Sequence, residues 1–159
     1  MPRKKKPEFC GWRVEDDSSR AFYRKNKGIF AEASNRLVPL DPKDENDRKR
    51  LLNEVESHLE WKSDEPTPFI SVYGKENPAK REAHRRKQIG HRNVIIHYVE
   101  IPKAENDRPI YYRHVPTLME ALGSEVPEHV GGSAEDEFIF LHHIPGEFIY
   151  AFLRMRDED

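Results

Sequence analysis

The chain has 159 residues, which is enough for one ordinary domain and too few for two. Charged residues make up 35% of it and hydrophobic residues only 36%, which excludes a large apolar core, while eight Phe, six Tyr and two Trp argue against a disordered chain. The net charge of −2 is unevenly spread: residues 1–36 carry 10 basic and 5 acidic side chains, residues 74–93 carry 7 and 2, and residues 120–159 carry 2 and 10. Such a distribution can steer an anionic ligand to one face, and an ordinary solvated surface explains it equally well.

The elements predicted by hydrophobic periodicity, caps and turn residues follow one another along the chain. In chain order they are a strand at Phe9–Val14, a helical turn at Ser19–Lys25, an extended piece at Gly28–Glu32, a helix over 43–60, a strand at Phe69–Tyr73, a helix at Asn77–Ile89, strands at Val94–Ile101 and Pro109–His114, a helix at Pro116–Leu122, and strands at Phe138–His142 and Phe148–Leu153. Asp41-Pro42 and Asn77-Pro78 are cap signals, and Gly90 is a stop signal. The last two strands are expected to form a hairpin around Pro145-Gly146. The pattern predicts an α+β fold of mostly antiparallel strands, with the helices concentrated in the first half.

The domain organisation is simple. We expect a basic flexible arm at 1–8, a single domain at 9–154 and an acidic tail at 155–159. The segment Pro2–Pro7 has the composition of a nuclear-import or phosphate-contacting arm, or of a frayed terminus. Cys10 is the only cysteine, so no internal disulfide is possible. No apolar leader or long apolar stretch is visible, so we expect a cytoplasmic or nuclear protein without membrane contact, and a monomer.

Three short motifs follow one another along the chain. They are an arginine in Gly11-Trp12-Arg13-Val14, a serine in the aromatic-flanked strand Phe69–Tyr73, and two glutamates in Glu135-Asp136-Glu137 before an apolar run. This order resembles the arginine–serine–glutamate class of ADP-ribosyltransferases. The resemblance extends to fungal domains of this type, which share a His-Leu-x-Trp…Thr-Pro-Phe-Ile-Ser segment, here His58–Trp61 and Thr67–Ser71. It covers roughly residues 9–153 and implies a split β-sandwich with NAD in the cleft between two small sheets.

The resemblance implies a role for each matched residue in cleaving NAD. The reaction passes through an oxocarbenium-like state, as glycoside hydrolysis does. Arg13 would bind NAD through its phosphates or on its nicotinamide-ribose side, and a guanidinium suits the phosphates because it makes bidentate contacts to their oxygens. Ser71 would hold the catalytic glutamate or the ribose in place, although this chain has Ile70-Ser71-Val72 where many relatives have Ser-Thr-Ser.

Glu137 is the expected catalytic carboxylate, bonding the 2′-hydroxyl of the nicotinamide ribose and offsetting the developing positive charge. Glu135 would orient or deprotonate the acceptor, since residues two apart in an extended segment face the same way. Tyr73 shares a strand face with Ser71 and is either a stacking partner for nicotinamide or a half-buried strand tyrosine. His58 either caps its helix or faces the site, with a structural role favoured, and Trp61 is expected in the core.

Metal chemistry is not expected, because His84, His91 and His97 are spaced too loosely and lack acidic or thiolate partners. The basic helix Asn77–Ile89 suits contact with nucleic acid or with NAD phosphates, and a solvated helix face is the commoner explanation.

The function expected from the resemblance is an NAD-dependent mono-ADP-ribosyltransferase, which uses NAD as its substrate. The acceptor would be a protein, with arginine favoured, or a nucleic acid. Two alternatives stay open: an NAD glycohydrolase, with water as the acceptor, and a non-catalytic module on the same fold that binds a protein or nucleic acid partner.

Overall fold

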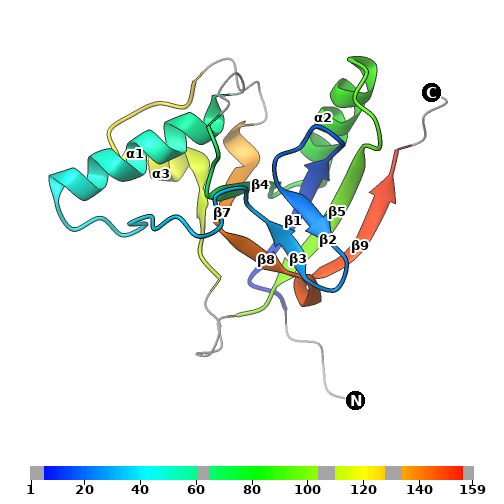
Figure 1. The fold of residues 1–159 in the computed structure, drawn as a ribbon, viewed down its shortest axis with the longest axis horizontal. Helices are drawn as coiled ribbons and strands as arrows, with labels where there is room; N and C mark the ends of the chain where they lie inside the picture. Colours follow the sequence, from blue (N-terminus) through cyan, green and yellow to red (C-terminus); the bar gives the residue numbers. More distant parts are fainter. Residues whose placement is uncertain (1–5, 61–64, 104–109, 128–133, 156–159) are drawn as a thin grey trace.

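A computed structural model describes residues 6–60, 65–103, 110–127 and 134–155. Its strands form two sheets, with the order β6-β7-β4-β1-β5-β9 in the larger and β2-β3-β8 in the smaller (Figure 1). The larger sheet contains β1 (Phe9–Glu15), β4 (Phe69–Tyr73), β5 (Ile95–Ile101), β6 (Tyr112–His114), β7 (Glu137–Leu141) and β9 (Ile149–Arg154). The smaller contains β2 (Phe22–Arg24), β3 (Gly28–Phe30) and β8 (His143–Pro145). The described strand pairs are antiparallel.

Three helices accompany these strands in the described part of the chain: α1 (Glu45–Leu59), α2 (Glu76–Gln88) and α3 (Val115–Ala121). Two short 3₁₀ turns lie at Ala134–Asp136 and Gly146–Phe148. The α+β fold with antiparallel strands is therefore confirmed.

The larger sheet is covered on both faces, because its strands alternate between two sets of apolar neighbours. In β4, Ile70 joins a cluster with residues of the smaller sheet, such as Ile29 and Ile144. The preceding residue, Phe69, joins a second cluster with residues of α1 and α3. A third cluster places Ala79 and Ala83 of α2 against β1 and β5. The smaller sheet thus packs on one face of the larger sheet, and the helices pack on the other.

The centre of the larger sheet is open at one end. β1 follows β5 over seven residue pairs, from Phe9↔Ile101 to Glu15↔Ile95. Against β4 on its other side, β1 is paired among the described residues only at Trp12↔Tyr73. Beyond that point the two strands separate, and the backbone carbonyls along the gap need other donors.

Several predicted elements were placed correctly. The strands β1, β4, β5 and β7 lie within a residue or two of their predicted ranges, and α3 starts one residue early with Pro116 in its first turn. Gly90 follows α2 with φ +95°, and the N–H of His91 reaches back to the carbonyl of Arg86, so the predicted stop is confirmed.

The helix starts differ from the prediction. α1 begins three residues later than the Asp41-Pro42 signal, because the Asp44 side chain accepts the N–H of Asp47 and so caps the helix. α2 begins before Asn77, with Lys75 at the cap position and Pro78 in the first turn.

Two larger predictions were wrong. Residues 22–24 of the expected helical turn Ser19–Lys25 form β2, held against β3 by the pairs Phe22↔Phe30 to Arg24↔Gly28. The last strands do not form a hairpin. His142 has φ +67° and turns the chain out of the larger sheet after β7, so that β8 pairs with β3. The chain returns to the larger sheet only as β9, which pairs with β5 at the far edge.

Gly28 is the residue that allows β3 to pack closely on β8. It has φ +110°, and a Cβ built there would lie 2.0 Å from the backbone oxygen of Ile144. Gly90 also has a positive φ, but a Cβ there would meet nothing within 4 Å. We therefore expect Gly90→Ala to lower the free energy of unfolding by about 1 kcal/mol, from backbone strain alone. Gly28→Ala should cost about 3 kcal/mol or more, because a backbone clash is added. Urea denaturation of both variants measures the difference, and equal costs would contradict the close packing.

Candidate functional site

A cleft of about 390 Å³ opens where β1 and β4 separate, and it is lined by Arg13, His58 and Ser71 together with residues from the end of α2. Each of these side chains comes from a different element. Arg13 lies on β1, Ser71 on β4, and His58 one residue before the end of α1. The cleft therefore brings together two of the five predicted site residues, Arg13 and Ser71, with a histidine that had been given a structural role.

A chain of hydrogen bonds runs from the mouth of this cleft to a buried carboxylate. Thr67 Oγ1 lies 2.7 Å from His58 Nδ1, and His58 Nε2 lies 2.7 Å from Ser71 Oγ. Ser71 is in turn hydrogen-bonded to the carboxyl group of Glu137. At its outer end, Thr67 Oγ1 accepts the backbone N–H of Phe69 at 3.2 Å. Four side chains from three segments are thereby connected in a single line.

The protonation of this line follows from burial. Loss of solvent, reinforced by the nearby positive charge of Arg13, lowers the pKa of His58 to about 3, so its ring is neutral and carries one N–H. An ionised Glu137 accepts the hydroxyl proton of Ser71, so Ser71 Oγ accepts the proton on His58 Nε2. His58 Nδ1 then accepts the hydroxyl proton of Thr67. One tautomer of His58 satisfies every hydrogen bond in the line, and each donor gives its hydrogen bond in the direction of Glu137.

Glu137 places a carboxyl group inside the larger sheet, where burial makes a negative charge unfavourable. Its side chain is 7% exposed, it opens β7 opposite Tyr73, and its Oε2 atom is buried without a hydrogen-bond partner. Desolvation raises the pKa of Glu137 to about 7, against the opposing effects of the Ser71 hydrogen bond and the Arg13 charge. A buried carboxylate with an open acceptor atom is costly, and it is typical of a binding or catalytic position. Glu137 does not itself line the cleft but lies behind Ser71.

Arg13 occupies the gap between the separated strands. One of its terminal nitrogens donates to the carbonyl of Ser71 and the other to the carbonyl of Ala21, each at 3.0 Å. Its Nε is buried without a partner. Burial lowers the pKa of Arg13 to about 10, which still leaves the side chain a cation at neutral pH. The guanidinium therefore replaces the missing strand pairing and places a fixed positive charge beside the line of hydrogen bonds.

The remaining two predicted residues lie elsewhere. Glu135 is exposed in the 3₁₀ turn Ala134–Asp136, so the expectation that it lies in an extended segment and faces the same way as Glu137 was wrong. Its backbone carbonyl accepts a hydrogen bond from His114 Nε2 at 2.6 Å, which fixes that turn. Tyr73 packs with Trp12 against the cluster under α2 and does not line the cleft, and burial raises the pKa of its hydroxyl.

A second charged group at the cleft had not been predicted. Asp16 is only 4% exposed and accepts hydrogen bonds from Ser18, from Arg86 at 3.1 Å and from His91 at 3.0 Å. Burial alone would raise the pKa of Asp16, but the bonds from Ser18 and His91 outweigh it and lower the pKa to about 2. From the sequence, Arg86 belonged to the basic helix Asn77–Ile89, for which contact with nucleic acid or NAD phosphates and a solvated face were both open. Nothing in a single sequence shows that the end of α2 folds back onto the loop after β1.

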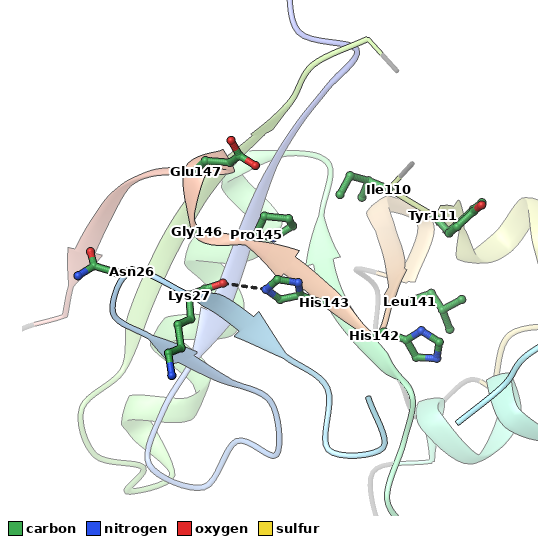
Figure 2. A pocket seen from close by; sticks show the side chains of 10 residues that line it. All are labelled: Asn26, Lys27, Ile110, Tyr111, Leu141, His142, His143, Pro145, Gly146 and Glu147. Carbon is green, nitrogen blue, oxygen red and sulfur yellow. Dashed lines mark hydrogen bonds between the residues drawn. The ribbon is translucent and has the colours of Figure 1, made fainter. Parts of the chain in front are cut away.

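A larger hollow, of about 670 Å³, lies around β8 and the turn between β2 and β3 (Figure 2). Its two histidines are held by the backbone: His143 Nε2 donates to the carbonyl of Lys27, and His142 Nε2 to that of Arg36. None of the five predicted site residues lines it. We therefore assign the smaller cleft as the candidate site, on its chemistry.

Other site types find no support within the described ranges. Those residues contain no group of three or more His, Cys, Asp or Glu side chains placed to hold a metal ion. They also contain no helix that is long and apolar enough to cross a bilayer. Trp61 of the fungal-type segment lies outside the described residues.

Comparison with known proteins bears on the family of this chain. No curated protein matches it. Residues 7–158, nearly the whole chain, match a family described as a domain of unknown function, DUF7587, and the chain belongs to that family.

Proposed function

We propose that this domain is an NAD-dependent mono-ADP-ribosyltransferase, in which Glu137 is the catalytic carboxylate. One observation carries the proposal: the line Thr67–His58–Ser71–Glu137 ends at a buried carboxylate with a free acceptor atom, beside the fixed cation Arg13. Arg13, Ser71 and Glu137 are the three residues on which the resemblance to the arginine–serine–glutamate class rests.

The geometry suits the departure of nicotinamide from NAD. The bond between the ribose carbon and the nicotinamide nitrogen breaks, the electron pair leaves with nicotinamide, and positive charge develops on the ribose. An acceptor atom then supplies the electron pair of the new bond to that carbon and loses its proton to a base. The Oε2 atom of Glu137 would accept a hydrogen bond from the 2′-hydroxyl of that ribose, and the negative charge of the carboxylate would stabilise the cation. Ser71 and His58 would hold the carboxylate in one orientation, because each is itself fixed by a hydrogen bond on its other side.

One unpaired donor atom and two further guanidinium groups at the cleft fit the anionic part of the same substrate. Arg13 Nε is a buried donor without a partner, and Arg85 and Arg86 line the cleft from the end of α2. Together they would bind phosphate oxygens, as guanidinium groups do elsewhere.

The decisive experiment is nicotinamide release from NAD by the purified domain, first in buffer and then with a cell extract and labelled NAD. A transferase should release nicotinamide faster with the extract and leave label on an acceptor macromolecule. Release in buffer alone, without labelled acceptor, would identify a glycohydrolase instead. Glu137→Gln is the matched control and should be inactive in both conditions.

Glu135→Gln should separate transfer from bond cleavage. Glu135 is exposed in the turn that precedes β7, so it is accessible to an acceptor and contributes no buried charge. We expect the variant to lose labelled acceptor by about 100-fold, the scale of general-base assistance, while NAD hydrolysis changes by less than about threefold. The check is the ratio of the two products by chromatography. Equal losses of both activities would remove Glu135 from the acceptor role.

A non-catalytic module on the same fold is the second candidate, and one observation favours it. Both terminal nitrogens of Arg13 are occupied by backbone carbonyls, and Glu137 is covered behind Ser71. A domain of this kind would release no nicotinamide under any condition. Salt-sensitive binding of nucleic acid to the basic face of α2 would then be the activity to measure.

A further inference from the structure

The strand β9 forms an exposed edge of the larger sheet and is unusual in its side chains. It runs from Ile149 to Arg154 along the outer margin of the molecule (Figure 1). Five of its six residues are exposed, including Tyr150 at 58%, Phe152 at 66% and Leu153 at 52%. Natural edge strands are usually short, charged or interrupted by proline, since a free row of N–H and C=O groups invites pairing with another strand. β9 is six residues long, contains no proline and carries no charged side chain before its last residue, Arg154.

The opposite edge of the same sheet shows the usual protection. β6 spans only Tyr112–His114 and carries Arg113, which is paired with Asp41 at 3.0 Å. The contrast within one sheet indicates that the exposure of β9 is a specific feature and not a general property of this fold.

Apolar side chains flank β9 on both faces. Phe152 pairs with His97, and the ring of His97 lies 5.0 Å from the ring of Tyr23 on β2. On that face the exposed rings of Phe152 and Tyr23, which is 38% exposed, are therefore separated by the ring of His97, which is only 3% exposed. Leu153 pairs with Ile96 and so lies on the other face, the one covered by α2. A strand added beside β9 would meet apolar side chains above and below its backbone.

The charges at the two ends of β9 indicate which strand pairs with its exposed edge. Glu147 lies two residues before β9, and Arg154 is its last residue. When two copies of β9 pair antiparallel about a two-fold axis, the start of each strand lies beside the end of the other. Each Glu147 then lies near Arg154 of the second copy, and the uncharged centres face each other. A parallel pairing would instead bring like charges together.

We propose that β9 is a self-association surface, through which two copies of this chain pair their edge strands antiparallel and join their larger sheets into one continuous sheet. Tyr23 and Phe152 on one face and Leu153 on the other supply the buried apolar area, and two symmetric Glu147–Arg154 pairs fix the register. This departs from the monomer expected from the sequence, which rested on no particular residue.

Sedimentation equilibrium of the full chain over about 1–300 µM tests the proposal. The wild type should shift from the 18.8 kDa of one chain towards twice that mass as the concentration rises. Phe152→Lys should weaken association at least about tenfold, because it places a charge in the apolar centre. Leu37→Lys is the matched control: Leu37 is 82% exposed and lies outside the sheets, so its replacement should leave association unchanged.

A charge-reversal cycle tests the antiparallel register. Glu147→Lys and Arg154→Glu should each weaken association, and the double variant should restore it, because the pair is then reversed and not lost. Circular dichroism and thermal unfolding confirm that each variant is folded. A wild type that stays at the mass of one chain throughout overturns the proposal. So does a dimer that survives Phe152→Lys, or a double variant that is weaker than both single ones.

Discussion

Glu137→Gln is expected to abolish nicotinamide release, with a loss of about 1000-fold or more, and at the same time to stabilise the fold above pH 7. The loss of activity follows from removing the negative charge that would face the ribosyl cation, since an electrostatic contribution of this kind is worth several kcal/mol. The gain in stability follows from removing a buried charge. Glu137 is 7% exposed, and its Oε2 has no partner.

The sign of the stability effect comes from the pKa of Glu137. Burial raises this pKa from 4.5 in the unfolded chain to about 7 in the folded protein. The folded state therefore holds its proton more tightly, and the stability linked to this group is fully present below pH 4.5. It is lost as the pH rises through 7. A shift of this size corresponds to about 3 kcal/mol, because each pH unit is worth about 1.4 kcal/mol. Glutamine does not ionise in this pH range, so the variant keeps the stability that the wild type loses when Glu137 ionises.

Urea denaturation of the wild type and Glu137→Gln at pH 4.5 and pH 8 measures this difference, and the gain should appear only at pH 8. The activity of the wild type should rise through pH 7 to a plateau, because the carboxylate is the active form. Glu120→Gln, an exposed glutamate on α3, is the matched control and should change neither quantity. A variant that is inactive and also less stable at pH 8 would mean that Glu137 holds the fold together and that its loss says nothing about catalysis.

Sequence patterns predicted the strands that carry Arg13 and Ser71 and one that begins just after Glu137, but not the distances between the three side chains. Arg13, Ser71 and Glu137 lie on β1, β4 and β7, which are consecutive in the sheet order. Periodicity predicts such strands, because every second side chain meets the core. That β1 and β4 separate beyond the pair Trp12↔Tyr73 is a property of two strands together, and no local pattern in either one contains it.

His58 illustrates the same limit from another direction. Its position near the end of α1 suggested a helix cap, since histidine is common in the last turn. In the fold it points instead to Ser71 and Thr67, with both ring nitrogens occupied. The useful signal was the spacing of the fungal-type segment, in which the histidine, the threonine and the serine occur together. The prediction for Glu135 was wrong because it extended the alternation of side chains along β7 back by two residues. Those residues form a 3₁₀ turn, in which side chains do not alternate between two faces.

His58→Gln is expected to become more stable than the wild type as the pH falls below 6.5. Burial lowers the pKa of His58 from 6.5 to about 3, so the stability linked to its neutral ring is fully present above pH 6.5 and is lost as the pH falls towards 3. At pH 4 the wild type should have lost about 3 kcal/mol from this group, at about 1.4 kcal/mol for each pH unit below 6.5. Glutamine cannot be protonated, and its amide still presents a donor towards Ser71.

The measurement is the free energy of unfolding of the wild type and His58→Gln between pH 7.5 and pH 4, with the exposed His84→Gln as the matched control. The difference in stability between His58→Gln and the wild type should grow by about 1.4 kcal/mol for each pH unit below 6.5, whereas His84→Gln should show no such difference. If Ser71 and Glu137 depend on His58 for their orientation, the variant should also lower the rate of nicotinamide release at pH 8, while the affinity for NAD changes little. A difference that stays constant with pH would show that the histidine ring is solvated, and the line from Thr67 to Glu137 would then not form the buried unit on which the proposed catalysis depends.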